Sequence, residues 1–320
     1  MDDIRWFAPN RYAALVAHEL RREGLAVALE GSAPARVAVS MSGTTALRAW
    51  KYARRVGCPL LLYIWDLPPE ATGAGSYDPV LPLGRILLRV PRLRGGYGRR
   101  RGYYSRLRYI ASRAREVWVP SSLTRELVKS RFDVEPRLMP YCYDSNRFRR
   151  MAVEKESPPT LLTVGRFEAH KNHQATIRAA SRLGSGVQVR LIGRGPEAPT
   201  LARTASALRV SCRIETEADD DAVADAYHRS RVTVCPSRFE GFGLTPMEAI
   251  ACGTPVVASD IPAHREFVRT AARLFPLDDD EALASAAARA LGCNTPCSDL
   301  DDLTIPAAAA RFRSGLRPML

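Results

Sequence analysis

Short apolar runs alternate along the chain with segments whose apolar residues recur at helical spacing. Each run leads into a turn rich in glycine, proline or asparagine, which predicts a buried strand followed by an amphipathic helix. This alternation predicts an α/β protein with parallel sheets. The predicted strands lie at residues 4–8, 37–39, 60–64, 117–119, 161–164, 187–192, 232–235 and 255–258.

A polar, proline-containing stretch at residues 151–159 divides this pattern into two halves. Each half has about 150 residues, the size of a single domain. We therefore expect two doubly wound Rossmann-like domains that face each other across a cleft. The expected limits are 1–150 for the first domain, 151–159 for a linker, 160–300 for the second domain, and 301–320 for a tail that could pack back on the first.

Composition excludes a disordered or fibrous chain, since 46% of the 320 residues are apolar and 25% are charged. The 47 lysines and arginines exceed the 34 aspartates and glutamates by 13, and only four of the 47 are lysines. Arginine binds phosphates and carboxylates with two parallel hydrogen bonds. An anionic partner is therefore expected, which could be a nucleic acid, an acidic membrane surface or a phosphorylated substrate.

Cysteine usage and the apolar runs indicate a cytoplasmic protein. The seven cysteines are an odd number and widely spaced, which favours reduced thiols over a disulfide framework. Cys235 and Cys252 lie within apolar runs and are expected in the core. The first residues are acidic, unlike a signal peptide, and no apolar run approaches the roughly 20 residues of a membrane span.

The turn after the predicted strand at 161–164 carries two basic side chains. Arg166 and Lys171 lie in one loop that leads into a helix. In open parallel sheets ligands bind at the carboxyl ends of the strands, and the free amides at a helix start attract anions. This loop therefore predicts a binding site for a diphosphate.

The turn after residues 232–235 is the most informative part of the chain. Gly241 and Gly243 allow backbone amides to face an anion, and a helix start follows them. Glu240 and Glu248 flank this loop and could accept hydrogen bonds from sugar hydroxyls. Residues 245–248 also match a capping box, which by itself would explain the glutamate at position 248.

At these residues the sequence resembles the family-4 retaining glycosyltransferases, which have the two-domain GT-B fold. The similarity is strong over about residues 160–266 and weaker in the first half. It is carried by Glu240 and Glu248 with seven residues between them, the insert 241–244, the segments 251–259 and 260–266, the pair Arg166 and Lys171, and the stretch 139–144.

This resemblance implies transfer of a sugar from a nucleoside diphosphate sugar to a glycan or lipid-linked acceptor, with no metal. Arg166 and Lys171 correspond to the basic pair that holds the donor diphosphate. Glu240 corresponds to the carboxylate on the donor sugar, and Glu248 to the residue on the ribose. The amides of Gly241, Phe242, Gly243 and Leu244 correspond to the phosphate-binding loop. The donor base, the donor sugar and the acceptor do not follow from the sequence.

The N-terminal half departs from the family pattern in two places. Asn10 occupies the position of a glycine-rich loop and is a candidate for donor contact. Trp65 and Asp66 stand where many relatives carry His-Asp, so Asp66 is a candidate for orienting the acceptor or the sugar.

A second function class stays open because of the segment from Arg85 to Arg115. It holds eleven arginines interleaved with tyrosines and no acidic residue. This pattern is typical of a segment that binds an anionic membrane surface. The alternative is that the segment is simply a solvent-exposed helix face. Single-stranded nucleic acid, bound by an inactive glycosyltransferase scaffold, is the less favoured reading.

The glycosyltransferase hypothesis makes three mutational predictions. Glu240→Gln and Lys171→Ala should suppress transfer with little change in melting temperature. Glu248→Ala should weaken donor binding and cost about 1 kcal/mol through a lost helix cap.

Overall fold

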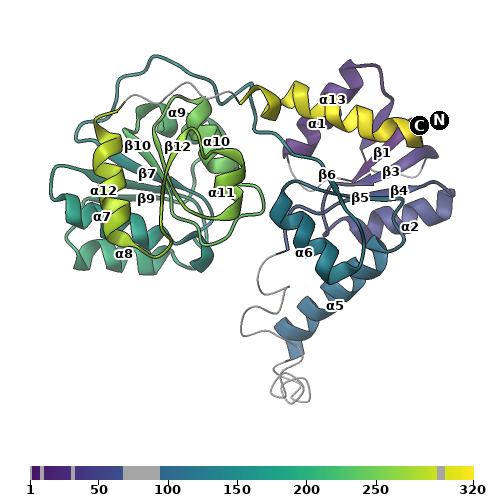
Figure 1. The fold of residues 1–320 in the computed structure, drawn as a ribbon, viewed down its shortest axis with the longest axis horizontal. Helices are drawn as coiled ribbons and strands as arrows, with labels where there is room; N and C mark the ends of the chain where they lie inside the picture. The colour runs from purple at the N-terminus through teal and green to yellow at the C-terminus, as the bar shows by residue number, and fades with distance from the viewer. Residues whose placement is uncertain (1, 8–10, 30–32, 68–93, 294–299) are drawn as a thin grey trace. The chain divides into compact units, whose positions relative to one another are not determined.

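The chain folds into two compact units, shown in Figure 1. The computed structural model describes residues 2–7, 11–29, 33–67, 94–293 and 300–320. The first unit comprises Met1–Cys142 with Ile305–Leu320, and the second comprises Tyr143–Thr304. Each unit contains one parallel sheet, as the sequence predicts.

The first unit is built on a six-stranded parallel sheet in the order β2-β1-β3-β4-β5-β6. Every residue of the central strand Leu60–Tyr63 is buried, because helices cover both faces of the sheet. The strands are β1 (Asp2–Phe7), β2 (Val27–Leu29), β3 (Ala35–Ser40), β4 (Leu60–Tyr63), β5 (Glu116–Val119) and β6 (Arg137–Leu138). The helices are α1 (Arg11–Arg22), α2 (Ala46–Val56), α5 (Arg94–Ala111), α6 (Ser122–Phe132) and α13 (Ile305–Leu316).

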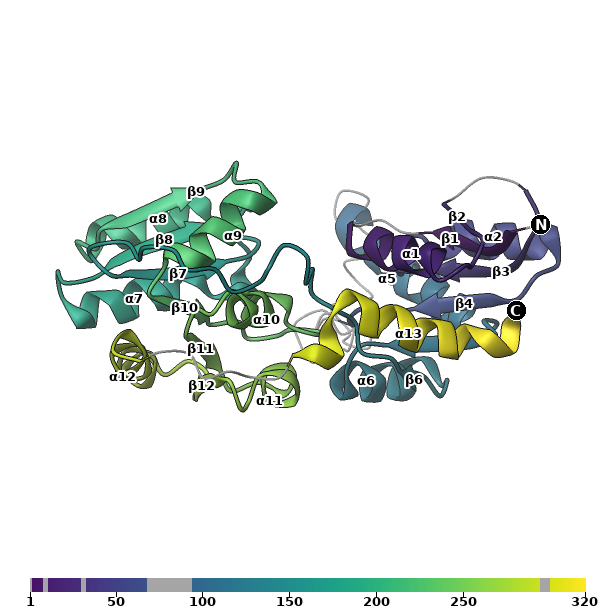
Figure 2. The same cartoon turned by 90° about the horizontal axis from the view of Figure 1, so that it is seen from above.

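The C-terminal helix α13 lies on the first unit's sheet beside α1 (Figure 2). Its Phe312 is buried and stacks on Tyr63, with the two ring centroids 5.6 Å apart. Arg311 of the same helix donates to the carbonyl oxygens of Pro140 and Tyr141. The C-terminal segment Ile305–Leu320 thus belongs to the first unit.

The second unit is a six-stranded parallel sheet in the order β12-β11-β10-β7-β8-β9. Helices α8, α7 and α12 pack together over one apolar face of it. The strands are β7 (Thr160–Val164), β8 (Gln188–Ile192), β9 (Cys212–Glu215), β10 (Val232–Cys235), β11 (Val256–Ser259) and β12 (Ala272–Phe275). The helices are α7 (His173–Leu183), α8 (Ala198–Ala207), α9 (Asp220–Arg229), α10 (Leu244–Ala251), α11 (Pro262–Phe267) and α12 (Asp280–Leu291).

The boundary between the units differs from the expected one. It falls between Cys142 and Tyr143, and the stretch expected to be a linker belongs to the second unit. Lys155 donates to the carbonyl oxygens of His228 and Ser230, at 2.6 and 3.0 Å. The polar composition of residues 151–159 therefore reflects anchoring side chains rather than a free connection.

Three smaller features concern the cysteines, the acidic runs and the apolar helices. Cys235 and Cys252 are free thiols and buried in the core, as predicted. Asp219 and Asp279 cap α9 and α12 by accepting from amides three residues ahead, so these acidic runs stabilise helix starts. Within the described ranges no helix is long and apolar enough to cross a membrane.

Candidate active site

The loop after β7 is held against the loop after β8 by close backbone packing. The Gly165 amide donates to the Ile192 carbonyl at 2.9 Å, and the Phe167 amide donates to the Arg194 carbonyl at 2.8 Å. A Cβ at Gly193 would clash with the Gly165 carbonyl oxygen, and a Cβ at Gly195 would clash with that of Phe167. Glycine at these two positions therefore lets the Arg166–Lys171 loop sit at the carboxyl edge of the sheet.

Lys171 and Glu240 meet at the carboxyl ends of the neighbouring strands β7 and β10. The Lys171 Nζ atom lies 2.7 Å from Glu240 Oε1 and 2.8 Å from Oε2. The two side chains are only 18% and 15% exposed. The Ser237 hydroxyl donates a further hydrogen bond to Oε1 at 2.7 Å. The structure thus brings together two of the residues that the sequence singled out.

The Glu240 carboxyl is kept ionised by its neighbours. Burial opposes its ionisation, but the Lys171 ammonium and the hydrogen bonds from Lys171 and Ser237 outweigh burial. The pKa of Glu240 is therefore held below its ordinary value. A carboxylate in this state only accepts hydrogen bonds.

Arg166 lies in the same loop but does not join this pair. Its guanidinium is 66% exposed and donates to Glu168 at 2.6 Å. It is therefore available at the surface of the loop, whereas Lys171 is partly enclosed.

The glycine-rich turn leads directly into α10. Gly243 is the N-cap residue and has a φ of 87°, in the left-handed region that glycine favours. Phe242 is buried and packs on Phe267 at 4.5 Å between ring centroids, so its side chain anchors the turn and only its backbone can face a ligand. Gly241 and Gly243 flank this anchor, and α10 begins at Leu244. Backbone amides in the first turn of a helix can bind an anion.

Glu248 is not the partner in a capping box. The helix starts one residue before Thr245, and its N-cap residue has no side chain, so the capping interpretation is wrong. Glu248 is 7% exposed, and its Oε2 accepts a hydrogen bond from the Tyr227 hydroxyl at 3.1 Å. The Tyr227 contact positions this carboxylate on the first turns of α10.

Two buried imidazoles near the Lys171–Glu240 pair, those of His173 and His264, were not predicted as site residues. His264 Nδ1 lies 2.8 Å from the Ser259 carbonyl oxygen, so Nδ1 carries the proton. Its other edge faces Gly243, and burial lowers the pKa of His264. His173 lies at the start of α7 beside Gly165, and burial with the Lys171 charge lowers its pKa to about 4. No described residue hydrogen-bonds the Nε2 atom of either ring.

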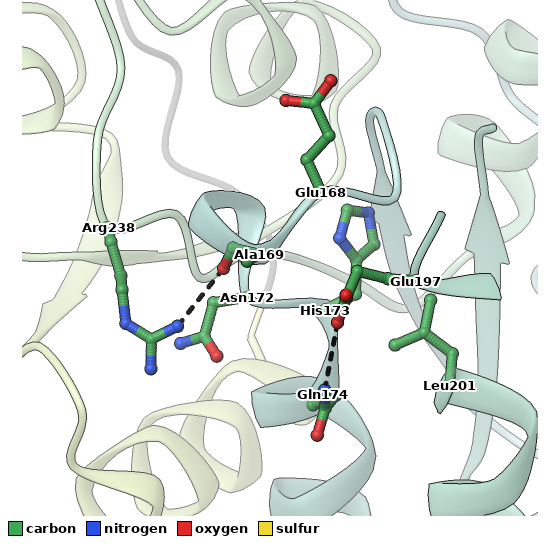
Figure 3. Close-up of a pocket in the computed structure, with 8 residues that line it drawn as sticks. All are labelled: Glu168, Ala169, Asn172, His173, Gln174, Glu197, Leu201 and Arg238. Carbon is green, nitrogen blue, oxygen red and sulfur yellow. Dashed lines mark hydrogen bonds between the residues drawn. The ribbon is translucent and has the colours of Figure 1, made fainter. Parts of the chain in front are cut away.

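A small pocket of about 90 Å³ opens beside the Arg166–Lys171 loop (Figure 3). Arg238 donates to the Ala169 carbonyl at 3.3 Å, and Gln174 donates to Glu197 at 3.4 Å. Neither Lys171 nor Glu240 is among its lining residues, so the ion pair and this pocket are separate features. The pocket is lined by Glu168, Ala169, Asn172, His173, Gln174, Glu197, Leu201 and Arg238.

In the first unit, Asp66 follows β4 and is exposed. Its charge, second to burial, raises the pKa of Tyr103 on α5, so the two groups interact. The Tyr103 hydroxyl lies so close to Gly43, after β3, that a Cβ there would clash with it. Asn10, the other candidate of this unit, lies outside the described residues.

Comparison with known proteins gives the family. The sequence model described as "Glycosyl transferases group 1" matches residues 144–303, which is half of the chain and nearly the whole second unit. The chain belongs to the glycosyl transferases group 1 family.

Curated relatives match about half of the chain or less. The chain is 26% identical over 183 residues to the O-antigen chain mannosyltransferase RfbU of Salmonella typhimurium, covering 56% of this chain and 52% of that protein. It is 34% identical over 135 residues to the phosphatidyl-myo-inositol mannosyltransferase of Mycolicibacterium smegmatis, covering 40% and 34%. The chain thus spans about half the length, or less, of these relatives.

Solved structures extend the similarity to the whole chain. The sucrose-phosphate synthase of Thermosynechococcus elongatus superposes with a TM-score of 0.70 at 17% identity, covering 100% of this chain and 95% of that one. HepE from Anabaena, in complex with UDP and glucose, gives 0.68 at 13% identity, covering 98% and 95%. At this identity the likeness concerns the fold, and this group 1 glycosyltransferase family member has the GT-B fold.

Proposed function

We propose that this chain transfers a sugar from a nucleoside diphosphate sugar to an acceptor hydroxyl, with retention of anomeric configuration and without a metal ion, as in family 4. The observation that carries the proposal is the Lys171–Glu240 pair beside the Gly243 turn. A cation for phosphate, a carboxylate for hydroxyls and a free helix start lie at one edge of one sheet. A sugar nucleotide needs all three.

In this proposal Lys171 and Arg166 bind the donor diphosphate. Both cations offset the negative charge that develops on the leaving diphosphate, which is the task that a metal performs in other transferases. The amides at the start of α10 complete the phosphate site. Glu240 accepts hydrogen bonds from the donor sugar, and Glu248, held by Tyr227, accepts from the ribose.

Donor binding must first separate Lys171 from Glu240, because the two form a bidentate pair. The diphosphate replaces Glu240 as the partner of Lys171, and sugar hydroxyls replace Lys171 at Glu240. Ser237 stays bonded to Glu240 and limits its movement. The pair therefore keeps the two side chains oriented before the donor arrives.

On the acceptor side, Asp66 and Tyr103 are the groups that we assign to a glycan or lipid-linked acceptor. They lie at the carboxyl end of the first unit's sheet, where ligands of open α/β sheets bind. No described residue hydrogen-bonds the Tyr103 hydroxyl, and Asp66 interacts with it electrostatically. A hydroxyl donor and a carboxylate together suit an acceptor that carries hydroxyl groups.

Isothermal calorimetry of the full chain with UDP-, GDP-, ADP- and dTDP-sugars tests the proposal. One of these donors should bind, and Lys171→Ala should weaken its binding at least tenfold, about 1.4 kcal/mol. Lys129→Ala is the matched control, because Lys129 is exposed and pairs with Glu135 in the first unit. Absence of binding to every donor, or equal effects of the two variants, would sink the proposal.

A further inference from the structure

Helices α2 and α5 of the first unit pack side by side, and the described charged side chains on them are all basic. Neither helix contains an aspartate or a glutamate. Their inner residues, such as Ala49 and Ile110, are buried in the apolar core beneath them. Six exposed cations define what we call the basic face: Lys51, Arg54, Arg55, Arg106, Arg108 and Arg113, the last just beyond the end of α5.

The charge of the basic face is not neutralised internally. No described carboxylate forms an ion pair with any of its six cations. Elsewhere in the described structure exposed arginines are commonly paired, for example Arg229 with Asp225 and Arg265 with Asp260. An ordinary solvated helix surface mixes both signs of charge. The basic face should therefore attract an anionic partner more strongly than a surface of mixed charge does.

Two aromatic rings lie in the middle of the basic face. Trp50 on α2 and Tyr109 on α5 meet edge to face, with ring centroids 5.8 Å apart. The Arg54 guanidinium lies over the Trp50 ring at 5.0 Å, and that of Arg113 lies over the Tyr109 ring at 3.6 Å. Tyr109 is 46% exposed. Aromatic side chains beside arginines are typical of surfaces at the lipid–water interface.

These contacts favour a lipid surface over a nucleic acid. Single-stranded nucleic acids stack their bases on open aromatic faces. On the basic face an arginine covers one side of each ring, and the edge of one ring packs against the face of the other. Binding to a bilayer requires only that the ring edges reach the level of the headgroups and that the cations contact the headgroup phosphates.

We infer that the basic face docks the protein onto a bilayer that contains anionic phospholipids. The headgroup phosphates pair with the six cations, and Trp50 and Tyr109 enter the interface. This inference does not depend on the proposed transfer reaction, because none of these residues belongs to the candidate active site. It places the binding surface on α2 as well as on the arginine-rich segment of α5.

Flotation of the full chain with phosphatidylcholine vesicles, with and without phosphatidylglycerol, tests the inference. Binding should require phosphatidylglycerol and weaken with added salt. Each cation at an anionic surface contributes about fivefold to partitioning, so Lys51→Glu/Arg54→Glu should bind at least about 25-fold more weakly. The matched control Arg182→Glu/Arg203→Glu changes net charge equally on exposed helix positions of the second unit, and should bind like the wild type.

A second readout concerns the aromatic pair. Brominated lipids should quench tryptophan fluorescence of the wild type, and Trp50→Phe should remove most of that quenching.

Equal loss of binding in the two charge-reversal variants would overturn the inference, as would unchanged binding of Lys51→Glu/Arg54→Glu. Displacement from vesicles by single-stranded RNA at equal phosphate concentration would reassign the basic face to nucleic acid. Donor calorimetry on the same variants should be unchanged, so this inference and the proposed function can fail separately.

Discussion

The Lys171–Glu240 ion pair can be tested by a double-mutant cycle of Lys171→Met and Glu240→Gln. The sequence alone led us to expect little change in melting temperature from substitutions at these positions. The structure reverses that expectation, because each side chain is less than one-fifth exposed and each is the other's counter-ion. Removing either one leaves a partly buried charge with a poorer partner.

The size of the effect follows from the geometry. At 2.7 Å and an effective dielectric constant of about 20, the attraction between the charges is about 6 kcal/mol, most of which offsets desolvation. A hydrogen bond to a charged group contributes about 1.5–3 kcal/mol net. We expect each single variant to lose about 2–3 kcal/mol of unfolding free energy. The double variant should lose less than the sum, with a coupling energy of about 2 kcal/mol.

Urea unfolding of the wild type and the three variants at pH 7 gives this coupling energy. Because the chain has two units, hydrogen exchange on peptides from β7 and β10 should show that the change lies in the second unit. The pair is present only above the lowered pKa of Glu240, so its contribution should disappear as the pH falls through that value. Additive single effects at pH 7, within about 0.5 kcal/mol, would refute the reasoning.

Three further predictions concern residues around this pair and in the first unit. The folded-state pKa of His173 is about 4, so the unfolded chain takes up the proton first as the pH falls. The free energy of unfolding should therefore fall by about 3 kcal/mol between pH 6.5 and 4. His173→Phe should not show this loss in urea titrations. Gly193→Ala should lower the unfolding free energy by at least about 2 kcal/mol in the same assay, whereas Gly186→Ala, with open space around its Cα, should not. Gly43→Ala should displace the Tyr103 hydroxyl and, like Tyr103→Phe, raise the KM for the acceptor while leaving that for the donor unchanged.

Periodicity located the central strands and their helices because those strands are buried on both faces. Leu60–Tyr63 is a continuous apolar run and Val232–Cys235 is apolar apart from one threonine, and the structure has strands there. The strands at the sheet edges were missed for the opposite reason. Arg137–Leu138 has only two residues, both exposed, and Cys212–Glu215 mixes charged and apolar residues. Pairing with a neighbouring strand, rather than local sequence, determines their conformation.

The candidate site was predictable as a set of residues but not as a set of contacts. Strand order places Lys171 and Glu240 at neighbouring strand ends, yet nothing local in the sequence indicates that they form an ion pair. The start of α10 was misassigned because it depends on the left-handed conformation of Gly243. His264 lies in the segment 260–266 that matches the family, but only the fold shows its imidazole against the glycine turn.

The resting ion pair also bears on which part of a donor the site can select. A nucleoside diphosphate without its sugar would take Lys171 and leave Glu240 partly buried, with the Ser237 hydroxyl as its one remaining hydrogen-bond donor among the described residues. Some of the nucleotide's binding energy would therefore offset the loss of the ion pair. A complete sugar nucleotide supplies hydroxyls to Glu240 and restores that loss. The proposed site should therefore bind the whole donor more tightly than the free nucleoside diphosphate. Glu240→Gln should narrow this difference, because a neutral amide no longer holds Lys171 by charge and accepts weaker hydrogen bonds from the sugar.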